Sequence, residues 1–268
     1  MSTPTSPFDT GSGTGQEPDP AADSERPPLS PSPPTPPAQM ARNLYRQAPV
    51  SAAAVAVILL VFAVTAVQSR SITGNLDESG LGDAWVLYLP LMDDSPFGPL
   101  RALGSGLLHA GIGHMLINVI LLYLIGRETE WTFGSPLTAG ILVTGAVGAS
   151  AMVLWRSPEY PTVGASGAVY ALMAVFVAIA YSRKNAQVGG ALVLIGVNLA
   201  YTLMTPGVSL WGHLGGLATG TILAAVLLTA RRTRTRWFGL CAVFALVVAA
   251  VLIRVAVFST GGSGIPLL

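Results

Sequence analysis

The sequence predicts an all-α polytopic membrane protein, and two observations carry this prediction. Hydrophobic residues make up 51% of the 268 residues and charged residues only 10%, against about 25% charged in an ordinary soluble domain. Apolar runs of about 20 residues, long enough to cross the hydrocarbon core as a helix, recur along the chain.

The net charge of +1 argues against a nucleic-acid partner. The single cysteine, Cys241, excludes a disulfide framework and a cysteine-based zinc cluster.

Residues 1–41 form a distinct N-terminal segment. They hold eleven of the twenty prolines and five of the thirteen acidic residues. Such a segment has too few aliphatic side chains to form a core. We therefore expect a disordered, Pro-rich cytoplasmic tail, and a docking site for proline-recognition modules is the alternative.

Seven membrane spans are expected from about residue 49 onward. Lys and Arg are enriched on the cytoplasmic side of membrane proteins. From residue 42 onward, nine of them fall on the inner side and four on the outer side if the N-terminus is cytoplasmic. We therefore expect the N-terminus inside and the C-terminus outside. The expected spans are residues 49–68, 103–126, 136–155, 166–181, 186–204, 208–230 and 237–258.

The first outer connection, residues 69–102, is long for a compact fold. It combines apolar residues, Trp85 and Tyr88 among them, with five acidic residues. An aromatic ring with one polar group favours the depth of the lipid headgroups. We expect this loop to pack on the helices or to lie in the membrane interface.

Four polar residues inside the expected spans suggest a functional site, because such groups are costly in lipid. His114 and Asn118 are four residues apart and share one helical face. Ser166 opens the fourth span, and His213 lies near the outer end of the sixth. All three spans begin on the outer side, which places the four side chains at one depth.

This set of residue types is suited to nucleophilic catalysis. A serine hydroxyl is a weak nucleophile until a base takes its proton, and histidine is the usual base. Asn118, His114 and the backbone N–H of Ser166 are donors suited to a tetrahedral oxyanion. Gly164 and Gly167 would allow a close approach of backbone or substrate.

Other residues near this set are interpreted as supporting it. Tyr170 lies one turn below Ser166 and is expected to pack against the His213 ring. Gly216 and Gly220 follow Gly212 at four-residue spacing, which is typical of helix packing. They would let the sixth span approach the fourth.

We interpret His109 as a structural residue. It lies five residues before His114, about 140° round a helix, so it does not share that residue's face. It is expected to tie the long outer loop to the start of the second span.

These motifs resemble the rhomboid family of intramembrane serine proteases over residues 85–230. The matching features are His109-x4-His114-x3-Asn118, Gly164-Ala165-Ser166-Gly167 with Tyr170, His213 followed by Gly216 and Gly220, and the sequence GRETE at residues 126–130 as an inner-loop pattern.

The resemblance implies a Ser–His dyad without an acidic third member. Ser166 would be the nucleophile and His213 the general base. His114, Asn118 and the Ser166 N–H would form the oxyanion hole. Neither a cofactor nor a metal is implied. The implied substrates are single-pass membrane proteins in the bilayer, cut near the outer end of their transmembrane helix.

The resemblance also implies a domain organisation. Residues 42–230 would form a rhomboid-like six-helix catalytic domain, with the fifth span and residues 205–212 as lateral gate and cap. Residues 231–268 would add a basic inner loop, a seventh transmembrane helix and a short outer tail. Where the family often has Trp-Arg in the first outer loop, this chain has Leu100-Arg101, and Trp85 is the candidate substitute anchor.

Other functions are weighed against this one. A catalytically silent rhomboid-like protein that binds membrane clients would typically lack the serine or the histidine. A small transporter would need charged residues along a mid-membrane path, and the spans have almost none. A zinc membrane protease would need His-Glu-x-x-His, which is absent. One lysine against thirteen arginines favours a GC-rich bacterium, and hence a bacterial plasma membrane.

Overall fold

The computed structural model describes residues 37–184 and 187–261. The chain divides into two units, Met1–Pro37 and Ala38–Leu268. The predicted tail, residues 1–41, therefore lies mostly outside the described residues. Its last residues belong to helix α1 (Pro37–Gln47), which begins a few residues before the predicted boundary.

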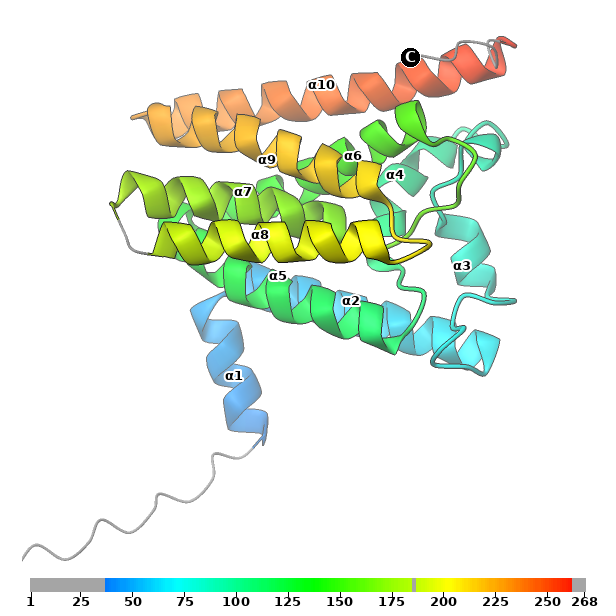
Figure 1. The fold of residues 1–268 in the computed structure, drawn as a ribbon, viewed down its shortest axis with the longest axis horizontal. Coiled ribbons are helices and arrows are strands. Elements are labelled where there is room, and N and C mark those ends of the chain that lie inside the picture. Colours follow the sequence, from blue (N-terminus) through cyan, green and yellow to red (C-terminus); the bar gives the residue numbers. More distant parts are fainter. Residues whose placement is uncertain (1–36, 185–186, 262–268) are drawn as a thin grey trace, which may run out of the picture. The chain divides into compact units, whose positions relative to one another are not determined.

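Each of the seven expected spans corresponds to an apolar helix in the described part of the chain (Figure 1). Five of these helices are long and apolar enough to cross a membrane, and α7 and α8 are shorter apolar helices. This confirms the predicted all-α polytopic fold class. The helices are α2 (Pro49–Ser69), α5 (Ile112–Phe133), α6 (Ser135–Arg156), α7 (Ser166–Ser182), α8 (Gln187–Met204), α9 (Leu210–Thr229) and α10 (Thr233–Ser259).

The second span is the one whose predicted limits, 103–126, are wrong. Residues before it form short turns, α4 (Arg101–Gly104) and η3 (Ser105–Leu107), and α5 begins only at Ile112. The chain is extended at Gly111, which precedes the helix. At the other end α5 continues to Phe133. The pattern at 126–130 is therefore helical and not part of an inner loop.

The buried carboxylate of Glu130 explains why α5 continues. It accepts hydrogen bonds from the backbone N–H of Val50 at 2.9 Å and of Ser51 at 3.0 Å, and from the Ser51 hydroxyl at 2.8 Å. These donors lie at the start of α2, where backbone N–H groups have no partner within the helix and favour negative charge. Gly126 lies one turn earlier, and a Cβ there would come within 2.6 Å of Ser51 Oγ. The last turn of α5 thus holds the start of α2.

We expect replacement of Glu130 with alanine to lower the free energy of unfolding by about 2–4 kcal/mol, because buried donors would be left unpaired. Unfolding by SDS titration measures this. The control is Glu128→Ala: Glu128 pairs with Arg127 at 3.6 Å and is about one third exposed, so its loss should change stability by less than about 1 kcal/mol. Equal effects of the two changes would contradict the anchoring role.

Helix α7 lies at the centre of the bundle and packs against α5, α6, α8 and α9 (Figure 1). Its closest neighbour is α9, because small residues line their contact. A Cβ on Gly216 would overlap the carbonyl of Gly167, and a Cβ on Gly220 would overlap the carbonyl of Ala171. The backbones therefore touch directly, which is the geometry that small residues allow between membrane helices.

The long outer loop is folded and packs on the helices, as its apolar content predicts. It contains α3 (Gly80–Trp85), η1 (Leu89–Leu91) and η2 (Gly98–Leu100). Leu87, Leu89 and Met92 are buried in a cluster with residues of α6 and α10. Helix α10 is held against α6 by Arg254, whose Nε donates to the Leu154 carbonyl at 3.0 Å. The seventh helix thus forms part of the surface on which the loop packs.

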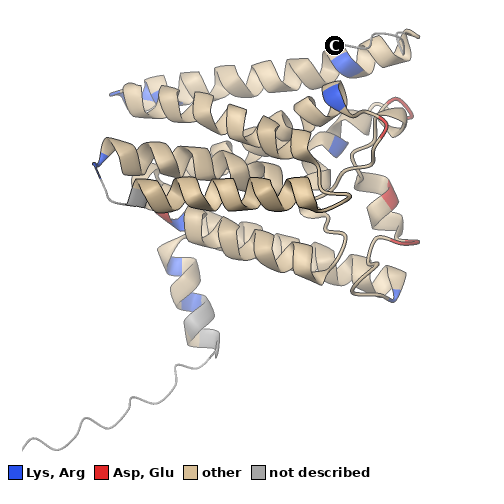
Figure 2. Ribbon diagram, viewed as in Figure 1, with Lys and Arg blue, Asp and Glu red and all other residues tan. Residues whose placement is uncertain are grey.

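Charged residues divide between the two ends of the helices (Figure 2). The end that carries the α5–α6 and α9–α10 turns has nine basic residues and two acidic ones among the described residues. The opposite end, which carries the long loop, has four basic and six acidic residues. The basic residues at the first end are Arg42, Arg46, Arg127, Arg183, Lys184, Arg231, Arg232, Arg234 and Arg236.

Candidate active site

Ser166 is the first residue of α7, and the outer loop holds the segment that leads to it. Leu87 and Thr162 exchange two backbone hydrogen bonds, of 3.1 and 2.9 Å, as an isolated antiparallel bridge. The N–H of Gly164 donates to the Ser105 carbonyl at 2.9 Å. Residues far apart in the sequence therefore determine where Ser166 stands at the end of the helix.

Both the backbone conformation and the close neighbours at position 164 require glycine. Its φ of +125° lies in a region that L side chains rarely adopt. A Cβ at this position would come within 2.7 Å of His114 Cε1 and 3.8 Å of Ser166 Oγ. Gly164 therefore lies between the imidazole of His114 and the hydroxyl of Ser166, and brings these two side chains to one place.

His213 lies in the first turn of α9 and is buried, with 6% of its surface exposed. Its ring stacks on the Tyr170 ring, with centroids 4.3 Å apart and planes at 21°. This is the contact expected from the sequence. Tyr170 is one turn from Ser166 on α7, so the stacking places His213 beside the face that carries the serine hydroxyl. Gly167 faces both α6 and α9, because an added Cβ would overlap the Ala149 side chain and lie 3.5 Å from the Gly212 carbonyl.

No hydrogen bond joins Ser166 to His213 among the residues that the structure describes. Catalytic hydrogen bonds are often long in the absence of substrate and shorten when it binds. The two residues thus share a site at the adjoining ends of α7 and α9 without forming a closed pair.

His114 and Asn118 share one face of α5, as their spacing predicts. The Asn118 side chain is buried, and its Nδ2 donates to the His114 carbonyl at 2.8 Å. An amide nitrogen carries two N–H groups, so one remains for another acceptor. His114 reaches the segment before Ser166 through its contact with Gly164.

His109 precedes α5 (Ile112–Phe133). Its position relative to His114 is therefore not given by the angle between residues of one helix. It is fully buried, and its ring lies edge-on to His114 at a centroid distance of 5.0 Å. Its Nε2 accepts a hydrogen bond from the Ala165 N–H at 3.4 Å. It therefore supports the residues next to Ser166 and His114, and its role in tying the outer loop to the helix stays a prediction. Burial, together with the neighbouring His114, lowers the pKa of His109 from 6.5 to about 3.

This lowered pKa predicts a loss of stability in mild acid. The unfolded chain binds a proton at His109 near pH 6.5, and the folded protein does not until about pH 3. The contribution of neutral His109 to the free energy of unfolding is therefore complete above pH 6.5 and decreases as the pH falls toward 3. Between pH 6.5 and 5, the unfolding free energy should fall by about 2 kcal/mol more in the native protein than in His109→Gln. SDS titrations at both pH values measure it, and equal pH dependence in the two proteins would contradict it.

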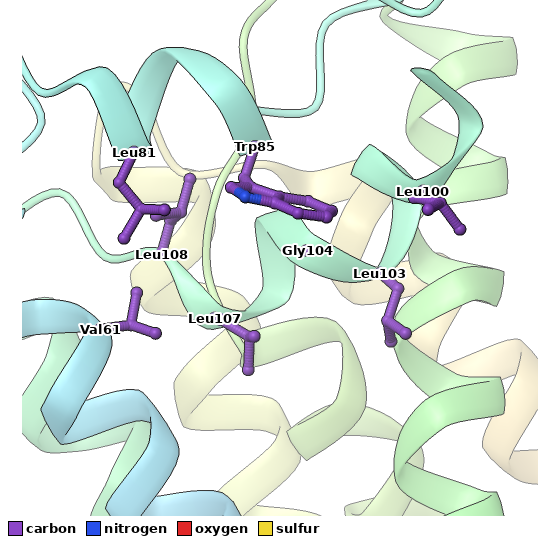
Figure 3. A pocket seen from close by; sticks show the side chains of 8 residues that line it. All are labelled: Val61, Leu81, Trp85, Leu100, Leu103, Gly104, Leu107 and Leu108. Carbon is purple, nitrogen blue, oxygen red and sulfur yellow. The ribbon is translucent and has the colours of Figure 1, made fainter. Parts of the chain in front are cut away.

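Trp85 anchors the outer loop. A Cβ on Gly104 would overlap the Trp85 ring, so the indole lies directly on the α4 backbone, as Figure 3 shows. Arg101 supports it by donating to the carbonyls of Asp83 at 2.7 Å and Val86 at 3.1 Å. Leu100, next to Arg101, is half exposed. Trp85 thus supplies the aromatic contact between the loop and α4.

An apolar cavity of about 250 Å³ lies under the Trp85 ring. Its lining contains no ionisable or nucleophilic side chain, so it is not a candidate for chemistry. The lining residues are Val61, Leu81, Trp85, Leu100, Leu103, Gly104, Leu107 and Leu108 (Figure 3).

A family model, the rhomboid domain, matches residues 97–230, which is half of the chain. The chain belongs to the rhomboid family. The matched range contains Ser166, His213, His114 and Asn118, and it leaves out α2 and α10.

Similar proteins come from bacteria, plants and animals. The chain is 33% identical to RHOMBOID-like protein 4 of Arabidopsis thaliana, over 48% of this chain and 34% of that protein. It is 30% identical to Rhomboid protease GluP of Bacillus subtilis (strain 168), over 47% of this chain and 26% of that protein. It is 31% identical to Rhomboid-related protein 3 of Homo sapiens, over 45% and 34%. The chain thus spans between about a quarter and a third of these relatives.

The sequence reasoning missed one pair of polar residues in this rhomboid. Asn198 and Thr202 lie four residues apart on α8, and the Thr202 hydroxyl is 2.7 Å from His213 Nδ1. The rule that selected His114 and Asn118, polar residues four apart in an apolar span, would also have selected this pair. Asn198 itself donates to the carbonyl of Leu194 at 2.8 Å.

Proposed function

We propose that this rhomboid-family protein is an intramembrane serine endopeptidase that uses Ser166 and His213 as a catalytic dyad. The observation that carries the proposal is the stacking of His213 on Tyr170, one turn along α7 from Ser166. It supports a base and a nucleophile at one depth in a bundle of apolar helices, a combination with no evident use in packing alone.

The proposed reaction is acyl transfer to serine followed by hydrolysis. Ser166 Oγ attacks the carbonyl carbon of the scissile peptide bond while His213 Nε2 takes the hydroxyl proton. The tetrahedral intermediate collapses, the C–N bond breaks, and the imidazolium returns the proton to the leaving amine. A water molecule then attacks the acyl-enzyme with the same base, which releases the carboxylic acid and restores Ser166.

The negative oxygen of the tetrahedral intermediate needs hydrogen-bond donors that point toward it. We assign this role to the Ser166 N–H, which lies at a helix start without an intrahelical partner, to the second N–H of Asn118, and to the His114 ring. The positive φ and lack of side chain at Gly164 support this assignment, because they allow His114 to approach Ser166. Gly167, Gly216 and Gly220 hold α9 close enough for His213 to reach the serine.

We further propose that the site faces the outer side of the membrane. Ser166 and His213 lie in the first turns of α7 and α9, at the end of the helices opposite the nine basic residues. Basic residues are enriched on the cytoplasmic side of membrane proteins. The N-terminus is then cytoplasmic and the end of α10 is outside. The composition favours a bacterial plasma membrane, and the family resemblance favours single-pass membrane proteins as substrates, cut near the outer boundary.

A serine-reactive fluorophosphonate probe tests the proposal without a known substrate. The purified protein in detergent should be labelled, and Ser166→Ala should not, because the probe needs an activated hydroxyl. His213→Ala should also lose labelling, since the base is gone. Ser182→Ala, at the other end of α7 where the Ser182 hydroxyl donates to the Ile179 carbonyl at 2.8 Å, is the matched control and should label normally. Labelling of Ser166→Ala would place the nucleophile elsewhere. Absence of labelling in the native protein would favour a silent, client-binding rhomboid.

A further inference from the structure

Thr202 is a buried polar residue on an otherwise exposed helix end. It is 4% exposed, whereas its neighbours on α8, Tyr201 and Leu203, are 60% and 71% exposed. Its side chain therefore faces the bundle, where α8 meets α9. The hydroxyl contacts two groups there, the Asn198 carbonyl at 2.8 Å and His213 Nδ1 at 2.7 Å.

These two contacts together determine the direction of both hydrogen bonds. A carbonyl oxygen only accepts, and a threonine hydroxyl has one proton. Thr202 must therefore donate its proton to the Asn198 carbonyl. Its oxygen then accepts from His213, so Nδ1 carries the ring proton. In a neutral imidazole the other nitrogen, Nε2, is left with a free lone pair.

We propose that Thr202 is a positioning residue that holds His213 in the tautomer required of a general base. The inference rests on the proposed protease function. The chain of bonds from Nδ1–H through the Thr202 hydroxyl to the Asn198 carbonyl fills the place that an acidic residue takes in a Ser-His-Asp triad. This chain of bonds differs in being neutral and in coming from α8. The position of α8 against α9 therefore decides whether His213 is held in the tautomer that a general base needs.

The hydrogen bond also serves the protonated state. When Nε2 takes the serine proton, Nδ1 keeps its own proton and continues to donate to Thr202 Oγ1, so no group has to rearrange. Without the hydroxyl, the two neutral tautomers would mix, and the one with the proton on Nε2 cannot accept from Ser166. The expected loss is that of one neutral hydrogen bond, about tenfold in kcat.

The test compares Thr202→Val, which keeps the shape and removes the hydroxyl, with Thr202→Ser, which keeps the hydroxyl. The full chain in detergent cleaves a model single-pass substrate, and kcat and KM are measured separately. We expect Thr202→Val to lower kcat about tenfold with KM within about twofold, and Thr202→Ser to retain most of kcat. Thr221→Val is the matched control, because the exposed Thr221 hydroxyl bonds only to the Leu217 carbonyl of its own helix. Unchanged kcat in Thr202→Val, or no rescue by serine, would overturn the proposal.

A second measurement reads the tautomer without catalysis. Nitrogen NMR of ¹⁵N-histidine-labelled protein, with His213 assigned by its loss in His213→Ala, distinguishes protonated from unprotonated ring nitrogens. We expect a protonated Nδ1 in the native protein and in Ser166→Ala, and mixed tautomers in Thr202→Val. A protonated Nε2 in the native protein would overturn the inference, whether or not the protein proves to be a protease. Loss of probe labelling with the expected tautomer would instead count against the proposed function alone.

Discussion

Replacing Ser166 or His213 with alanine is expected to abolish cleavage of a model single-pass membrane substrate while the protein stays folded. In the proposed mechanism Ser166 supplies the attacking oxygen and His213 takes its proton, so neither step has a substitute in the site. Losing one member of such a pair lowers kcat by roughly 10⁴-fold or more. Cleavage in proteoliposomes, followed by gel separation of the fragments, measures the loss.

The same experiment needs a measure of folding, because His213 is also packed on Tyr170 at 4.3 Å. Ser166→Ala removes only one oxygen from a half-buried position, so its SDS unfolding curve should match that of the native protein. Ser182→Ala on the same helix should retain full cleavage. Retained cleavage in Ser166→Ala or in His213→Ala would refute the dyad.

Replacing Gly216 with valine is expected to separate α7 from α9 and to destabilise the protein severely. A Cβ at this position overlaps the Gly167 carbonyl, and backbone cannot move aside as a flexible side chain can. Overpacking of this kind should lower the free energy of unfolding by more than about 3 kcal/mol. Activity should also fall, because His213 on α9 would move away from Ser166.

Gly196→Val on α8 is the matched control for this change. It is the same substitution in another apolar helix, at a glycine where an added Cβ meets nothing within 4 Å. Its SDS unfolding midpoint and its cleavage rate should stay close to those of the native protein. If Gly216→Val were as stable as Gly196→Val, the close backbone contact between α7 and α9 would be wrong.

Sequence reasoning works well for α2, α6, α7, α8, α9 and α10, and poorly for the start of α5. Residues 103–107 are apolar and continue into the second span, so composition alone extends the helix to them. The structure turns them into the short elements α4 and η3, since Trp85 packs on Gly104 and Gly111 is extended before the helix begins. Both causes come from contacts with the outer loop, which hydropathy does not contain.

The candidate site also has features that the sequence predicts and features that it does not. The spacing of His114 and Asn118 and the position of Ser166 at a helix start follow from the sequence, because one helical face and one membrane depth are periodic properties. The edge-on contact of His109 with His114 and the bond between Thr202 and His213 do not follow. Each depends on how two segments approach each other in space.

The sequence by itself determined the seven apolar helices found in the described part of the chain and where nearly all of them lie, because the thickness of the hydrocarbon core imposes both length and composition on each span. It also identified Ser166 and His213 as polar residues that lipid would not tolerate without a reason. Only the tertiary structure decided which other groups surround them: Gly164 and His109 beside His114, and Thr202 at His213 Nδ1. The physical reason is that hydropathy acts along the chain, whereas hydrogen bonds and ring contacts form between helices at distances of a few ångströms.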